Sequence, residues 1–220
     1  FSLLQYTELA EGVWFPKGGL YKVIETLARI AEGLGVRFVY NAPVKSINIE
    51  DGKATGITLE NGERLSADLV IANADLPYVY AELLPDDGSA RQLARKKFTS
   101  SALMFYWGIK GERSPALLHH NVFLADDRYK ASFDSIFKDL TLPEVPSFYI
   151  NAPTRTEGNF APADGDGLMA LVPVGHINED RPQDWEALKD KARRFVQGRL
   201  KDIGLGYIGE RMVFEETIGP

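Results

Sequence analysis

The hydrophobic pattern near the start of the chain predicts an amphipathic helix. An aromatic loop and a Gly18-Gly19 pair lead into it, and the stretch from Gly12 to Gly35 reads GVWFPKGGLYKVIETLARIAEGLG. The apolar residues recur at spacings of three and four, at Leu20, Val23, Ile24, Leu27, Ile30, Ala31 and Leu34. This spacing places them on one helical face, and Gly35 can end the helix in a left-handed conformation. We expect the apolar face to dock on a sheet formed by the residues that follow.

Strand-like segments dominate the next part of the chain. After a short strand at residues 36–40, the turns Asp51-Gly52 and Asn61-Gly62 separate three segments at 44–50, 54–60 and 63–66. Asp-Gly and Asn-Gly between strand-like segments are strong hairpin signals, so these residues predict a three-stranded antiparallel meander. Residues 68–74 (DLVIANA) are almost continuously apolar, which is typical of a strand buried on both faces.

The remainder of the chain alternates between helical and strand-like patterns. Helices are expected at residues 76–84, 90–97 and 126–140 and after Pro182; strands are expected at 101–109, 121–125, 147–151, 168–174 and 212–217. We therefore predict an α+β fold, a mixed or antiparallel sheet with flanking helices plus the three-stranded meander. Its two subregions are residues 1–75 and 76–220.

Composition narrows the possible functions. The 220 residues are 45% hydrophobic, carry a formal net charge of −6 and contain no Cys. An acidic chain is a poor sequence-independent nucleic-acid binder, and a chain without Cys has no thiolate chemistry or disulfides. No apolar run approaches the roughly 20 residues that span a bilayer. Because the pattern begins abruptly at Phe1 and there is no initiator Met, we expect a piece of a longer protein.

Several motifs do not support a catalytic or metal site. Gly204, Gly206 and Gly209 form a literal GxGxxG, but they follow a predicted helix and precede a strand, the reverse of the dinucleotide-binding order. His119 and His120 are adjacent and lack metal-ligand spacing, so we expect no metal. Asp164 and Asp166 lie in a Gly-rich segment that is typical of a solvated loop. The chain offers no GxSxG motif, and no catalytic acid or base can be assigned.

Aromatic residues cluster on two predicted strands and leave two interpretations open. The cluster comprises Phe105, Tyr106, Trp107, Phe148 and Tyr149. Such residues most often pack in a core, but they can also form the wall of an apolar ligand cavity. Gly18-Gly19 before a helix is similarly ambiguous, either an anion site or a permissive turn.

Longer strings in the sequence resemble a known family. GVWFPKGGLYKVIETLARIAEGLGVRF, NAPVKSI, GERLSADLVIANAD, FYWGI, HNVFLADD, YKASFDSIF, PSFYINAPTRT and ALVPVGH occur in this order. Together they resemble the central portion of phytoene desaturases (phytoene dehydrogenases) of the bacterial and fungal type, within the flavin amine-oxidase-like superfamily. The resemblance extends over essentially the whole chain.

This resemblance implies an FAD-dependent oxidoreductase whose GxGxxG half and C-terminal FAD segment lie outside the chain. Residues 1–75 would return to the FAD domain, with Val44, Ala72 and Asn73 near the adenine end of FAD. Gly18 and Gly19 would lie near the flavin. The isolated fragment would be inactive and would not retain FAD.

The resemblance also implies an apolar polyene substrate, bound by residues 76–220 together with the aromatic loop. The implied cavity residues are Trp14, Phe15, Pro16, Phe105, Trp107 and Phe148. A lipid-dissolved substrate implies a cytoplasmic protein that associates peripherally with a membrane. Two alternatives remain, a flavin-dependent polyene isomerase or related amine-oxidase-like flavoenzyme, and a non-catalytic module that binds a hydrophobic ligand or a partner protein.

Overall fold

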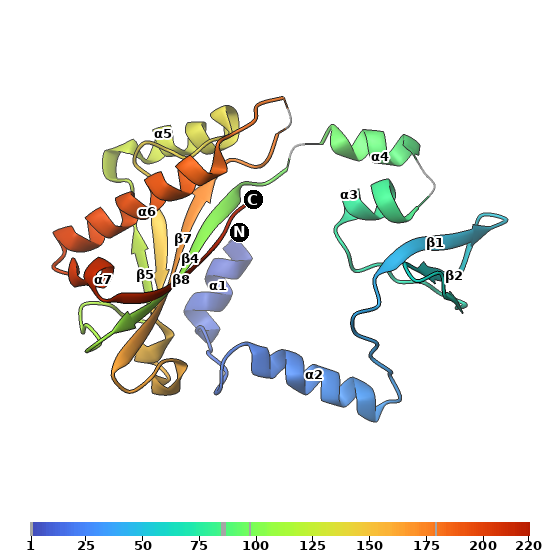
Figure 1. Cartoon of the computed structure of the whole chain (residues 1–220), viewed down its shortest axis with the longest axis horizontal. Coiled ribbons are helices and arrows are strands. Elements are labelled where there is room, and N and C mark those ends of the chain that lie inside the picture. The colour runs from blue at the N-terminus through green and yellow to red at the C-terminus, as the bar shows by residue number, and fades with distance from the viewer. Residues whose placement is uncertain (1, 85–86, 97, 179) are drawn as a thin grey trace. The chain divides into compact units, whose positions relative to one another are not determined.

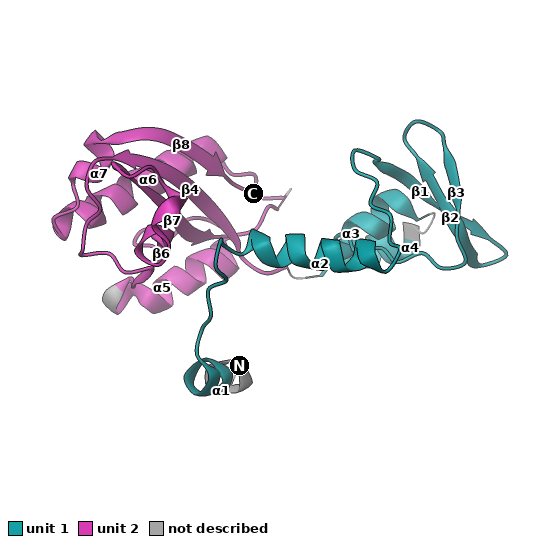
Figure 2. Cartoon of the chain, turned by 90° about the horizontal axis from the view of Figure 1, so that it is seen from below, with its two compact units in different colours: residues 1–97 teal, residues 98–220 magenta. Residues whose placement is uncertain are grey.

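The computed structural model describes residues 2–84, 87–96, 98–178 and 180–220. They form two compact units, Phe1–Lys97 and Phe98–Pro220, coloured separately in Figure 2. The sequence predicts a division after Asp75, whereas the first compact unit extends to Lys97. The helical residues after Asp75 belong to the first unit because Val79 and Leu83 pack against Ile47 of the meander.

The first unit opens with two helices (Figure 1). The first, α1 (Ser2–Glu11), was not expected from the sequence. The second, α2 (Tyr21–Gly33), is the predicted amphipathic helix, and Gly35 follows it at φ +89°. No residue of α2 is buried, so the expectation that its apolar face docks on a sheet is wrong for the described residues. The apolar side of the meander is instead covered by Val79 and Leu83.

The meander forms as the two turn signals predict. Strands β1 (Val44–Glu50), β2 (Lys53–Leu59) and β3 (Arg64–Ser66) pair antiparallel in that order. Asp51 and Gly52 both have positive φ, at +49° and +75°, as a type I′ hairpin turn requires. The backbone conformation of the two central residues thus explains why an Asp-Gly pair specified this hairpin.

Two predicted strands do not form. Residues 36–40 and 68–74 have no strand assignment and pair with no described strand. Within the second segment, Leu69 is 74% and Ile71 is 81% exposed. An apolar segment becomes a doubly buried strand only when neighbouring strands pair with it, and the described chain supplies none. The first unit ends with α3 (Leu76–Tyr78), the π-helical turn η1 (Val79–Leu83) and α4 (Asp87–Ala94).

The second unit is built on a five-stranded antiparallel sheet with the order β5-β6-β7-β4-β8. Its strands are β4 (Ser101–Lys110), β5 (His120–Phe123), β6 (Phe148–Asn151), β7 (Gly165–Val174) and β8 (Met212–Ile218). The central strands β4 and β7 pair continuously over ten residues, from Ser101 opposite Val174 to Lys110 opposite Gly165. The α+β class and the antiparallel sheet are therefore confirmed.

Helix α6 (Trp185–Asp202) covers one face of this sheet (Figure 1). The helix begins after Asp184, whose carboxylate accepts a hydrogen bond from the Ala187 N–H, a standard N-cap contact. The core between helix and sheet contains Leu103, Phe105, Ala170 and Val172 from the strands and Ala192, Val196 and Leu200 from the helix. Strict alternation along β4 and β7 leaves Met104, Tyr106, Met169 and Leu171 half-buried on the opposite face.

Short helical segments complete the second unit. The helix predicted at residues 126–140 forms as η2 (Asp126–Arg128), α5 (Tyr129–Asp134) and η3 (Ser135–Asp139), and it ends at Leu140 with φ +57°. The remaining segments are η4 (Pro153–Arg155), η5 (Gly158–Phe160) and α7 (Tyr207–Glu210). Among the described residues, no helix combines the length and the apolar character needed to cross a bilayer.

Candidate functional sites

The first unit contains a pocket of about 420 Å³ between the meander and the unpaired segment that follows it. It brings Val44 of β1 together with Ala72 and Asn73. The other residues that line it are Pro43, Ile47, Ile57, Val70, Ile71, Ala74, Tyr78 and Leu83. The pocket thus unites three of the five residues that the sequence analysis associated with a cofactor.

The backbone beside this pocket is available to a ligand. The peptide groups of Ala72 and Asn73 form no hydrogen bond with another described residue, and both residues are exposed. Backbone N–H and C=O groups require partners, and no described residue supplies one here. An extended segment with unused peptide groups beside an apolar pocket can bind a flat heterocycle, with its edge at the peptide groups and its faces against Val44 and its apolar neighbours.

Gly18 and Gly19 are not part of this pocket. They adopt φ +85° and +91°, and the Gly19 N–H donates to the Pro16 carbonyl at 2.9 Å, so the pair forms a tight turn before α2. Trp14 is 85% exposed and donates its indole N–H to the Glu11 carbonyl. Neither the glycine pair nor Trp14, Phe15 and Pro16 line any of the pockets described here.

The structure places the aromatic residues Phe105, Trp107 and Phe148 in the core. They are at most 2% exposed, on the sheet face that α6 covers. Phe148 stacks on Phe123 with 4.5 Å between ring centroids. Trp107 also lines a pocket of this unit. Because side chains alternate across a strand, the opposite face carries their neighbours instead, including Tyr106 and Tyr149.

A hollow of about 420 Å³ opens in the second unit where two strand glycines lie side by side. Gly108 of β4 pairs with Gly167 of β7, so neither strand places a side chain there. Its remaining lining residues are Tyr106, Trp107, Asn151, Pro153, Phe160, Ala161, Pro162, Asp166, Leu168, Met169 and Phe214. We call it the glycine hollow. Sequence reasoning missed it, although glycines inside the strings FYWGI and DGDGLM were the available signal.

A buried ion pair holds the loop that walls the glycine hollow. Arg155 contacts both carboxylate oxygens of Asp166 at 2.8 Å, and Thr154 donates its hydroxyl to the same carboxylate at 2.6 Å. Asp166 is 7% exposed and belongs to β7, so the expectation of a solvated loop is wrong for this residue. Arg113 donates to the carbonyls of Gly158, Pro162 and Gly165, which fastens the loop at three points.

Polar contacts extend from the hollow to a histidine pair. Asn151 donates to the Tyr149 hydroxyl at 2.9 Å, and this hydroxyl lies 2.5 Å from His120 Nδ1. The His119 and His120 rings stack with centroids 4.3 Å apart, and His119 Nδ1 contacts the Thr156 hydroxyl. Partial burial, and secondarily the charge of His120, lower the pKa of His119. Among the described residues, no group of three or more His, Cys, Asp or Glu could hold a metal ion.

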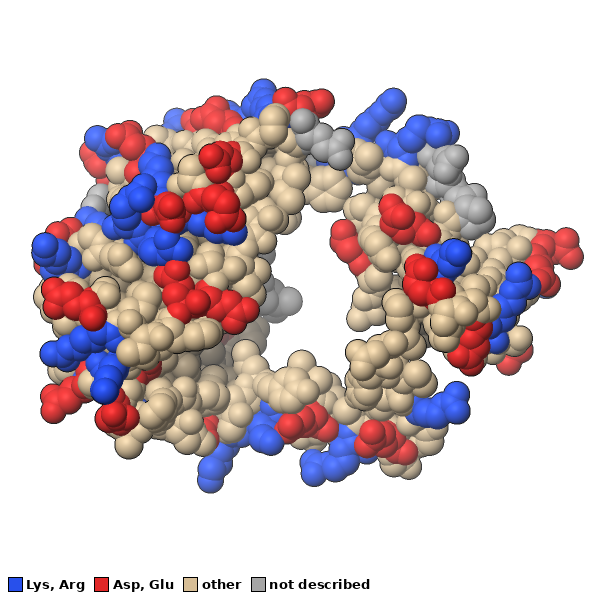
Figure 3. Space-filling view, in the orientation of Figure 1, with Lys and Arg blue, Asp and Glu red and all other residues tan. Residues whose placement is uncertain are grey.

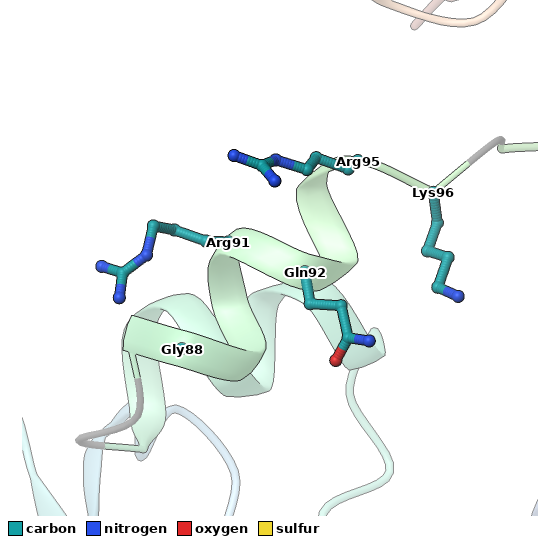
Figure 4. A pocket seen from close by; sticks show the side chains of 5 residues that line it. All are labelled: Gly88, Arg91, Gln92, Arg95 and Lys96. Atoms are coloured by element: carbon teal, nitrogen blue, oxygen red, sulfur yellow. The ribbon is translucent and has the colours of Figure 1, made fainter.

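Basic side chains gather on α4 at the end of the first unit (Figure 3). Arg91, Arg95 and Lys96 surround a shallow pocket of about 410 Å³ together with Gly88 and Gln92. Figure 4 shows Arg91 and Arg95 extending in the same direction from the helix, while Gln92 and Lys96 extend toward another side. Neither arginine forms an ion pair with a described residue, so this cluster can bind an anion.

Comparison with known proteins shows the family. Residues 1–194 match the family model described as flavin containing amine oxidoreductase. This chain belongs to that family. The phytoene desaturase of Neurospora crassa is 47% identical over 214 residues, a match that covers 91% of this chain and 36% of that protein. The zeta-carotene-forming phytoene desaturase of Myxococcus xanthus is 48% identical over 207 residues, which covers 93% and 39%. The resemblance seen in the sequence is thereby confirmed.

This chain spans well under half the length of these curated relatives, 36% of the first and 39% of the second. Solved structures agree on the fold. An oxidoreductase from Methanosarcina mazei aligns with a TM-score of 0.60 at 18% identity, over 92% of this chain and 43% of that one. A protein from Pyrococcus furiosus aligns with a TM-score of 0.58 at 17% identity, over 91% and 43%. At such identities the likeness extends to the fold alone.

Proposed function

We propose that this chain is the central portion of an FAD-dependent desaturase that acts on an apolar, phytoene-like polyene. The observation that carries the proposal is the family match over residues 1–194, together with curated desaturase relatives at 47% and 48% identity. In such an enzyme the flavin supplies the hydride acceptor, and the protein supplies binding, orientation and a dry environment. The two units of this chain are suited to different parts of that task.

The pocket of the first unit fits the adenine end of FAD. Val44, Ile47 and Ile57 offer apolar surface for the ring, and the unused peptide groups of Ala72 and Asn73 can hydrogen-bond its edge. The resemblance placed Val44, Ala72 and Asn73 at this end of the cofactor, and the structure assembles the same three residues around one pocket. We therefore assign the first unit to the FAD-binding side of the intact enzyme.

The second unit is suited to a hydrocarbon. A polyene has no polar group to bind, so its affinity must come from apolar burial, roughly 25 cal/mol per Å². The sheet face opposite α6 offers such surface in Met104, Tyr106, Met169 and Leu171. This face, and not the buried rings of Phe105 and Phe148, is the substrate wall that we propose.

Flavin content and product analysis of the intact protein test the proposal. It should carry oxidised flavin and convert a lipid-dispersed polyene to products two hydrogens lighter for each step. An isomerase would leave the mass unchanged, and a non-catalytic module would bind the polyene and return it intact. Either outcome would contradict the desaturase assignment, and a full-length protein without flavin would contradict the cofactor.

A matched pair of variants tests the cofactor site itself. Ala72→Phe places a ring in the pocket of the first unit and should lower the flavin content of the purified full-length protein. Ala67→Phe makes the same change at an exposed residue outside the pocket and should keep the wild-type flavin content. Equal flavin content in the two variants would contradict the assignment of this pocket to FAD.

We propose further that the intact protein works at an anionic membrane surface and docks there through α4. Exposed Lys and Arg near an anionic bilayer contribute about 1 kcal/mol each, and α4 and its end present Arg91, Arg95 and Lys96. The Arg91→Glu/Arg95→Glu double variant should lose binding to vesicles that contain phosphatidylserine. Lys53→Glu/Arg64→Glu changes the charge equally at exposed meander positions and should keep binding. Equal binding by both double variants would contradict this surface.

A further inference from the structure

The two glycines of the hollow are not required by the backbone. Neither Gly108 nor Gly167 adopts a positive φ, so an L-residue could occupy either strand position. Glycine in a strand interior weakens the strand and often marks a place where a ligand or another backbone comes close. Their pairing in register on neighbouring strands doubles the missing side-chain volume at one spot.

The two positions differ in what surrounds them. A Cβ on Gly108 would lie 3.1 Å from Phe214 Cβ, so that glycine is explained by the approach of β8. A Cβ on Gly167 would find a single neighbour within 4 Å, the Phe160 carbonyl oxygen at 3.4 Å, which is an ordinary contact. Packing therefore does not account for Gly167. A side chain at this position would instead take up space in the hollow.

The hollow is apolar in character and already formed. Three of its polar side chains are occupied, because Asn151 donates to Tyr149, Asp166 is bound by Arg155 and Thr154, and the Trp107 indole N–H donates to Glu215. The fourth, Tyr106, places its hydroxyl 4.0 Å from the sulfur of Met104. The wall that contains Phe160 is held by Arg113, which donates to the carbonyls on both sides of it. A preformed apolar cavity binds without an ordering cost and accepts hydrocarbon better than polar groups.

Position along the sheet indicates which part of a substrate would enter. The hollow lies where β4 ends and β7 begins, and the loop with Phe160, Ala161 and Pro162 forms one of its walls. Met104 and Leu171 continue the apolar surface from it along the same strands. Its volume of about 420 Å³ is at the lower end of the range of roughly 300–1,000 Å³ for small-molecule sites, which suits one end of a long polyene.

We propose that the glycine hollow is the subsite that receives the chain end of the polyene, and that Gly167 sets the length of chain accepted. This inference rests on the proposed function. A chain lying along Met104 and Leu171 would end against the Phe160 loop, with its terminal methyl groups over Gly167. A side chain on Gly167 would shorten the site by its own volume and would exclude the longest substrates first.

Gly167→Ala and Gly167→Val in the intact protein test the proposal. Polyene binding is followed by quenching of tryptophan fluorescence, and turnover is followed with the full-length substrate and an analogue shortened by one isoprene unit. The ratio of kcat/KM for the long to the short substrate should fall about threefold in Gly167→Ala and about tenfold or more in Gly167→Val. The loss should appear mainly as a higher KM and a weaker Kd for the long chain.

Gly198→Ala is the control, because Gly198 lies exposed on α6 with nothing within 4 Å of an added Cβ. It should leave the substrate ratio at the wild-type value. An unchanged ratio in both Gly167 variants, or an equal loss for long and short chains, would overturn the subsite while leaving the proposed function in place. If Gly167→Val fails to fold, Gly167→Ala decides. A wild-type protein that neither binds nor converts polyenes would instead overturn the proposed function.

Discussion

Trp107 and Glu215 join two neighbouring strands through side chains 108 positions apart. The Trp107 indole N–H donates to Glu215 Oε2 at 2.8 Å, and Arg193 of α6 contacts both oxygens of the same carboxylate. One half-buried carboxylate thus connects β4, β8 and the helix that covers them. A tryptophan in a core needs a partner for its N–H, and this contact supplies it.

Two substitutions of Glu215 should distinguish the stability contributed by its hydrogen bond with Trp107 from that contributed by its ion pair with Arg193. Glu215→Gln retains an acceptor for Trp107 but loses the ion pair, and we expect at most about 1 kcal/mol of destabilisation because Arg193 is partly exposed. Glu215→Ala leaves the buried indole N–H without a partner and should cost about 1–3 kcal/mol. Urea unfolding of the full-length protein measures both variants. Equal losses would show that the indole contact contributes nothing.

The ion pair beneath the glycine hollow should matter more than any surface charge. Asp166→Asn leaves Arg155, whose side chain is only 15% exposed, without a counter-charge and should destabilise the protein by about 3 kcal/mol. Asp164→Asn, two residues away at an exposed position, should stay within about 0.5 kcal/mol of the wild type. Thermal and urea unfolding of the two variants give the comparison. Similar stabilities for both would contradict a structural role for the pair.

The meander depends on a glycine at one position of β2. Gly56 has φ +148°, and a Cβ there would lie 2.0 Å from the Leu65 carbonyl oxygen, which is part of the backbone of β3. Gly56→Ala should therefore lower the free energy of unfolding by about 1–3 kcal/mol and reduce the flavin content of the intact protein. The control is Gly33→Ala in α2, which meets nothing within 4 Å and should stabilise the helix by up to about 1 kcal/mol. Amide exchange of the meander distinguishes the two variants. Wild-type exchange in Gly56→Ala would contradict the expectation.

The His119–His120 pair should make the protein less stable in mild acid. Burial and the neighbouring His120 lower the pKa of His119 below its ordinary value of 6.5, so the folded protein binds this proton less readily than the unfolded chain. The resulting loss of stability is absent well above that value and grows as the pH falls through it. When the pH is lowered from about 7.5 to about 5.5, the Tm of His119→Gln should therefore fall less than the Tm of the wild type. Equal slopes for the two proteins would contradict this sign.

Local patterns in the sequence determined the elements whose signals are short-range. The Asp51-Gly52 turn specified the first hairpin of the meander because both residues must adopt positive φ, and few residue pairs do so readily. The apolar segments of β4 and β7 and the helical spacing of α6 predicted these three elements of the second unit. The family strings indicated the chemistry, because several uncommon segments recur together in order.

Only the tertiary structure decided which surfaces are available. From the sequence, α2 and residues 68–74 should both be buried, yet burial requires partners, and the described chain covers neither. The sequence left open whether Phe105 and Phe148 are core or cavity wall, and the sheet register assigned them to the α6 face. The glycine hollow depends on Gly108 and Gly167, 59 positions apart, meeting on adjacent strands. Strand pairing over that distance depends on the packing of the whole unit and leaves no short-range signal in the sequence.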